Sequence, residues 1–184
     1  RTLGRTHLKV SEIGFGAWAI GGGMWGKTDD KVSLEALRRS LDLGVNFVDT
    51  AAVYGMGHSE QLVGKVYRER KGKFYVATKV PPKDMRWPPQ PGAPVKNVFP
   101  RAWIREQTEK SLRNLGLDCV DVQQIHVWSP NWVKETEWIE ELQKLRQEGK
   151  IRFFGVSIND HRPDEALELV RQGMADTIQV IYNI

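Results

Sequence analysis

The feature that most restricts the fold of this 184-residue chain is a regular alternation of short apolar segments with amphipathic helical segments. The apolar segments are rich in β-branched and aromatic residues, which predicts strands at 13–19, 47–50, 74–79, 120–126, 151–157 and 177–182. Their nearly continuous apolar character is typical of strands that are covered on both faces, as in a parallel sheet. The opening "RTLGRTHLKV" predicts a leading hairpin.

The segments between the strands carry apolar residues at helical spacing. One stripe is Leu34, Leu37 and Leu41, and another is Trp138, Leu142 and Leu145. Helix starts are predicted at residues 28–30 and 163–165, and helix ends at Gly44, Gly116, Gly149 and Gly173. Each helix is therefore expected to bury one face against the sheet.

Strict alternation of strands and helices leaves two architectures, an open doubly wound sheet or a closed (β/α)8 barrel. A closed barrel needs eight units and about 250 residues, whereas this chain supplies a hairpin, five βα units and a sixth strand. Its last segment, "IQVIYNI", would leave an unpaired parallel edge, and the chain begins without methionine. We expect residues 1–184 to form a single domain truncated at its C-terminus. A complete but inactive half-barrel is the alternative.

Charge and composition narrow the class of protein. The chain has 27 Lys and Arg against 23 Asp and Glu, a net charge of +4 without long runs of one sign. Its densest basic stretch, residues 68–73, is typical of the end of a helix, and this interpretation is favoured over a nucleic-acid site. The single Cys119 and four scattered histidines predict neither an internal disulfide nor a metal site. Without a signal peptide or a membrane-length apolar run, we expect a cytoplasmic protein.

Two segments have competing interpretations. Residues 81–100 hold seven of the nine prolines and follow the third strand, so they predict a functional loop, with an interdomain linker as the alternative. "GFGAWA" at residues 14–19 matches a dinucleotide-binding GxGxxA pattern. That pattern requires a helix directly after the strand, which "GGGMWG" delays, so a tightly packed first strand is favoured.

Four polar residues accompany the ends of three neighbouring strands. Asp49 ends the second strand and Tyr54 follows it, whereas Lys79 ends the third and His126 the fourth. In parallel α/β folds these ends meet at one edge, where barrel enzymes collect their active-site groups. A buried Asp49 needs a cationic partner, for which Lys79 is the candidate. Taken alone the pair also fits a structural ion pair, but Tyr54 and His126 in the same place favour catalysis.

These residue types suit proton transfer beside a carbonyl. A free tyrosine titrates near ~10 and is a poor acid at neutral pH unless its phenolate is stabilised. Lys79 would stabilise the phenolate of Tyr54, and Asp49 would hold the lysine in place. His126 would donate a hydrogen bond to the carbonyl oxygen. The expectation is that Lys79 makes Tyr54 more acidic.

The segment "FVDTAAVYGMGHSE", together with "ATK" and "QQIH", resembles the signature of the aldo-keto reductase family, and the similarity covers essentially the whole chain. The resemblance implies a (β/α)8 TIM barrel, here incomplete, and an Asp-Tyr-Lys-His tetrad at Asp49, Tyr54, Lys79 and His126. It also implies reversible hydride transfer from NADPH, with NADH as an alternative donor, to a small-molecule aldehyde or ketone. Potassium-channel β-subunits share this fold, so a non-catalytic, nucleotide-sensing subunit is a second hypothesis, which His126 disfavours.

The same resemblance implies cofactor contacts at Ala17, Trp18, Asp49, Ser157, Asn159 and Gln179. Ile158 displaces Asn159 from its usual place directly after the serine. A substrate pocket is predicted from tryptophans in loops that follow strand ends: Trp25, Trp87, Trp128 and Trp132. Trp103 and Trp138 lie on predicted helices and are expected in the core.

Overall fold

A computed structural model describes residues 1–23, 26–70, 72–159 and 162–182. Its strands form one parallel sheet in which spatial order follows chain order. The strands are β1 (Phe15–Gly16), β2 (Phe47–Asp49), β3 (Tyr75–Val80), β4 (Val120–Ile125), β5 (Ile151–Ser157) and β6 (Thr177–Gln179). A doubly wound sheet reverses its strand order at a switch point, so the sequential order rejects that architecture.

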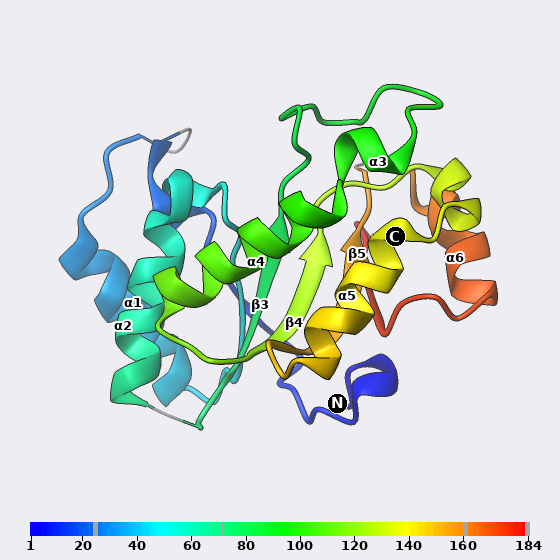
Figure 1. The fold of residues 1–184 in the computed structure, drawn as a ribbon. Coiled ribbons are helices and arrows are strands. Elements are labelled where there is room, and N and C mark those ends of the chain that lie inside the picture. Colours follow the sequence, from blue (N-terminus) through cyan, green and yellow to red (C-terminus); the bar gives the residue numbers. More distant parts are fainter. Residues whose placement is uncertain (24–25, 71, 160–161, 183–184) are drawn as a thin grey trace.

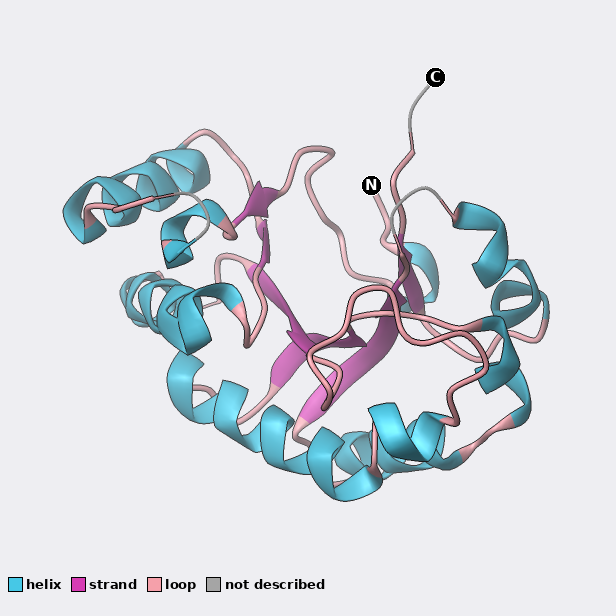
Figure 2. Cartoon of the chain, turned by 90° about the horizontal axis from the view of Figure 1, so that it is seen from above, coloured by secondary structure: helices cyan, strands magenta, loops and turns pink. Residues whose placement is uncertain are grey.

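Helices connect consecutive strands and cover the outer face of the sheet. They are α1 (Asp30–Asp42), α2 (His58–Glu69), α3 (Val95–Val98), α4 (Arg101–Leu115), α5 (Glu137–Gln147) and α6 (Leu167–Arg171). Seen from above, they form an arc around the curled sheet, open on the side where the chain ends lie (Figure 2). The six strands and their helices thus form an incomplete (β/α)8 barrel.

Local sequence signals set several helix ends. The Asp29 carboxylate accepts hydrogen bonds from the backbone N–H groups of Lys31 and Val32, at 2.7 and 3.4 Å, and so caps α1. Gly116 ends α4 in the left-handed conformation, with φ 65°. The predicted helix ends at Gly44, Gly149 and Gly173 also have positive φ.

Apolar side chains pack on both faces of the sheet. Its outer face packs on the helices, and the two predicted leucine and tryptophan stripes contribute to that core. A smaller inner core consists of Leu8, Ala77 and Val122 with Leu3, Val10, Phe47, Tyr75 and Phe153 packed around it. The N-terminal segment supplies Leu8 and lies below the sheet in Figure 1. Its predicted hairpin is reduced to one antiparallel bridge, Thr2 to Lys9, around a 3-10 turn.

The predicted strands at 47–50 and 120–126 each end one residue earlier in the structure, and the first and last strands are much shorter than predicted. β1 is two residues long because the chain turns after Gly16 and enters a 3-10 helix at Ala19–Gly21. β6 stops at Gln179 because it pairs only with β5, and residues 180–182 extend beyond that partner. The proline-rich segment rises over the end of the sheet toward which β4 points (Figure 1). Lys83 N–H donates to Val98 O at 2.9 Å, so this segment is a loop closed on itself instead of an interdomain linker.

Candidate active site

Four polar side chains meet at the carboxyl end of the sheet. Asp49 is the last residue of β2, Lys79 lies near the end of β3, and His126 directly follows β4. Tyr54 begins the 3-10 turn Tyr54–Gly57, after β2. The structure therefore places these four predicted residues in one site.

Lys79 is the centre of the group, and only 1 % of the residue is exposed. Its ammonium donates to Asp49 Oδ2 at 2.7 Å, to the carbonyl of Thr50 at 2.9 Å and to the hydroxyl of Tyr54 at 3.2 Å. An ammonium has three N–H donors, and these three acceptors use all of them. Because Lys79 donates to the tyrosine oxygen, the proton of Tyr54 is left to point toward another acceptor.

The turn that carries Tyr54 requires glycine at the next position. Gly55 has φ 61°, and a Cβ there would lie 2.1 Å from the carbonyl oxygen of Gly21. Glycine adopts this left-handed backbone without strain, and its lack of a Cβ permits such a close approach. The Tyr54 ring stacks on Trp18 at a centroid distance of 5.9 Å and meets His126 edge-on, also at 5.9 Å.

The pKa of Tyr54 corrects the expectation drawn from the sequence. Burial raises the pKa of Tyr54 above its ordinary value, Lys79 lowers it and Asp49 raises it, and the net shift is upward. Lys79 contacts Tyr54 and lowers its pKa as expected, but burial and Asp49 reverse the sign of the net shift. Tyr54, like an ordinary tyrosine, is protonated at neutral pH, which is the state a proton donor needs.

His126 is neutral at physiological pH. Burial, reinforced by the positive charge of Lys79, lowers its pKa to about 3. Trp87 holds its backbone: the indole N–H donates to the His126 carbonyl at 2.9 Å, and the rings meet edge-on at 5.7 Å. A neutral imidazole carries a single N–H, so His126 can donate one hydrogen bond to an acceptor without adding a positive charge to the site.

The predicted substrate tryptophans separate into different environments. Trp87 is 43 % exposed beside His126, at the site. Trp128 and Trp132 are fully buried with Trp138 in a cluster of edge-to-face rings. Their assignment to an open pocket is wrong, because each indole N–H is used by a backbone carbonyl inside the protein. Trp25 lies outside the described residues.

Trp138 and Trp103 were expected in the core. Trp138 is fully buried and Trp103 is partly buried against the same core.

The predicted cofactor residues fall into two groups, those with polar groups or rings available to a ligand and those bonded within the protein. Ser157 and Gln179 are register partners at the ends of β5 and β6, and Trp18 exposes its ring beside Tyr54. Ala17 is fully buried, and its N–H and C=O groups are bonded to Asp49 and Ser59. Asn159 donates its amide hydrogens to the Trp128 carbonyl and to Glu165. The backbone groups of Ala17 and the amide hydrogens of Asn159 are thus engaged within the protein, whereas Asn159 Oδ1 has no hydrogen-bond partner among the described residues.

The remaining donor set fits the carboxamide of a nicotinamide. Ser157 offers a hydroxyl, and Gln179 offers a side-chain amide that both donates and accepts. Both lie at the same edge of the sheet as Tyr54 and Lys79, and one oxygen of Asp49 is buried there without a hydrogen-bond partner among the described residues.

Sequence reasoning missed Gln124. Its side chain is 4 % exposed and donates to Gln179 Oε1 at 3.2 Å on the inner face of the sheet. The signal was available in "QQIH", because Gln124 precedes His126 by two residues and strand residues at that spacing share a face.

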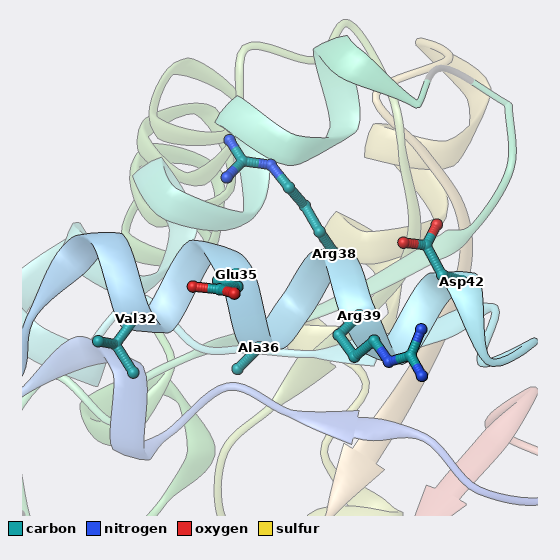
Figure 3. Close-up of a pocket in the computed structure, with 6 residues that line it drawn as sticks. All are labelled: Val32, Glu35, Ala36, Arg38, Arg39 and Asp42. Atoms are coloured by element: carbon teal, nitrogen blue, oxygen red, sulfur yellow. The ribbon is translucent and has the colours of Figure 1, made fainter.

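The site is distinct from the shallow depression drawn in Figure 3, which has a volume of about 560 Å³. That depression follows the outer surface of α1 and is lined by Val32, Glu35, Ala36, Arg38, Arg39 and Asp42. The described residues contain no group of histidine, cysteine and acidic side chains arranged to hold a metal ion. Among them, no helix combines the length and apolar character needed to cross a membrane.

Comparison with known proteins places the chain in a family. The aldo/keto reductase family model matches residues 12–184. This chain belongs to the aldo/keto reductase family. It is 40 % identical over 158 residues to the aldo-keto reductase YhdN of Bacillus subtilis, a match that covers 85 % of this chain and 46 % of YhdN.

Other relatives carry named activities or cofactors. The chain is 32 % identical to the NADH-specific methylglyoxal reductase of Escherichia coli, over 99 % of this chain and 58 % of that protein. It also superposes on a Klebsiella pneumoniae aldo-keto reductase solved with NADPH, with a TM-score of 0.73 and 27 % identity, over 99 % of this chain and 58 % of that one. This aldo/keto reductase chain spans about half the length of the curated relatives it matches.

Proposed function

We propose that this chain supplies the catalytic tetrad and part of the nicotinamide site of an oxidoreductase that reduces an aldehyde or ketone with NADPH. The observation that carries the proposal is the ammonium of Lys79, which bonds Asp49 on one side and the Tyr54 hydroxyl on the other. NADPH is favoured by the complexes of related enzymes, and the NADH-specific relative makes NADH the alternative donor.

Tyr54 is the proton donor in this proposal. A bound nicotinamide would supply the hydride to the carbonyl carbon. Tyr54 would then give its proton to the carbonyl oxygen, on which negative charge develops. The phenolate left behind would lie 3.2 Å from the Lys79 ammonium. The lysine therefore stabilises the charge that the proton transfer creates, although burial raises the pKa of the resting phenol.

Asp49 and His126 assist this proton transfer in different ways. Asp49 neutralises Lys79, which would otherwise be a buried unpaired cation. His126, kept neutral by burial, would donate its single N–H to the carbonyl oxygen and orient it toward Tyr54. Trp87 would line the substrate pocket and hold the backbone of His126. The substrate is proposed to be a small carbonyl compound that fits beside these rings.

The test is the variant Tyr54→Phe of this protein. We expect NADPH consumption with a panel of aliphatic and aromatic aldehydes to fall by at least about 100-fold, the scale of general acid catalysis. Cofactor binding, measured by the quenching of tryptophan fluorescence, should be retained because phenylalanine keeps the aromatic ring at position 54. Turnover that survives the substitution would reject Tyr54 as the acid. Absence of turnover in the parent protein, with retrieval of a membrane channel as a partner, would favour the nucleotide-sensing alternative.

A further inference from the structure

Three polar side chains form one layer inside the curled sheet. Asp49 on β2 is opposite Ala77 of β3, which is opposite Val122 of β4, and Gln124 lies two residues beyond Val122. The same relation repeats from Gln124 through Gly155 and Thr177 to Gln179 on β6. A shift of two residues for every two strands is the stagger of a tilted barrel, in which alternate strands contribute to one layer. The register therefore places Asp49, Gln124 and Gln179 in a common layer.

Hydrogen bonds link the three side chains of this layer in series, each donating to the next. Gln124 Nε2 donates to Gln179 Oε1 at 3.2 Å, and Gln179 Nε2 donates to Asp49 Oδ2 at 3.3 Å. Asp49 Oδ2 also accepts from Lys79. The layer thus leads from Gln124 to the ion pair that contacts Tyr54.

The direction of this series determines which way the Gln179 amide faces. A carboxylate only accepts hydrogen bonds, so the Gln179 nitrogen must face Asp49 and its oxygen must face away. Gln124 is the donor that meets this oxygen. If Gln179 turned over, its oxygen would face the Asp49 carboxylate, and with Gln124 held as it is the two amide nitrogens would face each other.

We propose that Gln124 is a positioning residue, which fixes the orientation of the Gln179 side-chain amide for recognition of a nicotinamide carboxamide. The part of this inference that concerns the nicotinamide rests on the proposed function. One N–H and one oxygen lone pair of Gln179 stay available after the two contacts are made. A fixed amide presents both to a ligand without an orientation cost. Because the Asn159 amide nitrogen is engaged elsewhere, Gln179 and Ser157 are the side-chain donors left for this recognition.

The neighbouring glutamine provides a matched control. Gln123 is fully buried on the opposite face of β4, and neither polar atom of its side chain has a partner in the described part of the chain. The variants Gln124→Leu and Gln123→Leu make the same chemical change one residue apart on one strand. A general effect of placing leucine in β4 would appear in both, whereas loss of the Gln179 contact appears only in the first.

The readout is the side-chain amide signal of Gln179 in nitrogen-15 NMR, assigned by its disappearance in Gln179→Leu. In Gln124→Leu we expect this signal to move toward that of a freely rotating glutamine, and in Gln123→Leu we expect it to stay in place. NADPH affinity of the protein should weaken by about 3- to 10-fold in Gln124→Leu, the effect of one hydrogen bond. The KM for NADPH should rise, with kcat changed by less.

A second variant separates donation from packing. In Gln124→Glu the ionised carboxylate cannot donate to Gln179, but a protonated carboxyl can. The Gln179 signal and the NADPH affinity should therefore recover as pH is lowered through the titration of Glu at position 124. An unchanged Gln179 signal in Gln124→Leu, or a changed signal with parental NADPH affinity, would overturn the inference. If the parent protein itself binds no NADPH, the proposed function and the part of the inference that concerns the nicotinamide fail together, and the NMR result still decides whether Gln124 orients Gln179.

Discussion

Gln179 on β6 donates to Asp49 on β2 at 3.3 Å, although three strands separate them in the sheet. Such a contact requires the sheet to curl until side chains from opposite strands meet over its inner face. The curl brings residues that are 130 positions apart in sequence into the same polar layer as the tetrad.

The first prediction concerns the buried ion pair. Lys79→Met should destabilise the fold by about 3 kcal/mol, because Asp49 is left as a largely buried carboxylate without its cation. Urea denaturation of the single and double variants measures this. The double variant Lys79→Met with Asp49→Asn should be less destabilised than the sum of the two single changes. Simple additivity would show that the two side chains do not interact.

The second prediction concerns pH. The pKa of His126 is depressed to about 3, so between that value and the ordinary value near 6.5 the unfolded chain binds more protons than the folded one. Stability should consequently fall as pH decreases from about 6.5 to about 3, by a few kcal/mol. Other groups titrate in this range, so the difference between the parent and His126→Gln is the relevant quantity. That difference should shrink on acidification, and a constant difference would contradict a buried neutral histidine.

The third prediction concerns Trp87. Trp87→Phe removes the indole N–H that holds the His126 carbonyl but keeps an aromatic ring beside the imidazole. We expect kcat/KM for carbonyl reduction to fall by about 3- to 10-fold, with a melting temperature close to that of the parent. Trp138→Phe is the control, because that indole bonds a backbone carbonyl in the buried core. It should lower the melting temperature and leave the kinetics of the folded protein unchanged.

The fourth prediction concerns the turn after Tyr54. Gly55→Ala should destabilise the protein by more than about 1 kcal/mol and impair catalysis, because its Cβ would collide with Gly21 and displace Tyr54. Gly149→Ala is the matched control: Gly149 also has positive φ, at 74°, but an added Cβ meets nothing within 4 Å. The control should show only the cost of the strained backbone. Equal losses of stability and activity in both variants would reject steric support of Tyr54 by Gly21.

Much of this architecture is readable from local patterns. Alternating apolar and amphipathic segments predict the order of strands and helices. A strand buried on both faces is apolar throughout, whereas a helix that buries one face carries a single apolar stripe. The strand at Ile151–Ser157 has the predicted bounds, and Asp29 and Gly116 mark helix ends by their own backbone chemistry. The four tetrad positions could be predicted because each accompanies the end of a strand, and parallel strands end at one edge of the sheet.

The sequence by itself determined which polar residues reach the carboxyl edge, since that depends on strand order and on the alternation of side chains. The tertiary structure alone decided what surrounds them. It buried Trp128 among other rings, engaged the amide of Asn159, and raised the pKa of Tyr54 where its charged neighbour predicted a fall. It also joined Gln124 to Gln179. Burial and desolvation depend on how distant segments pack over the curled sheet, and that packing is not encoded in the spacing of residues along any one strand.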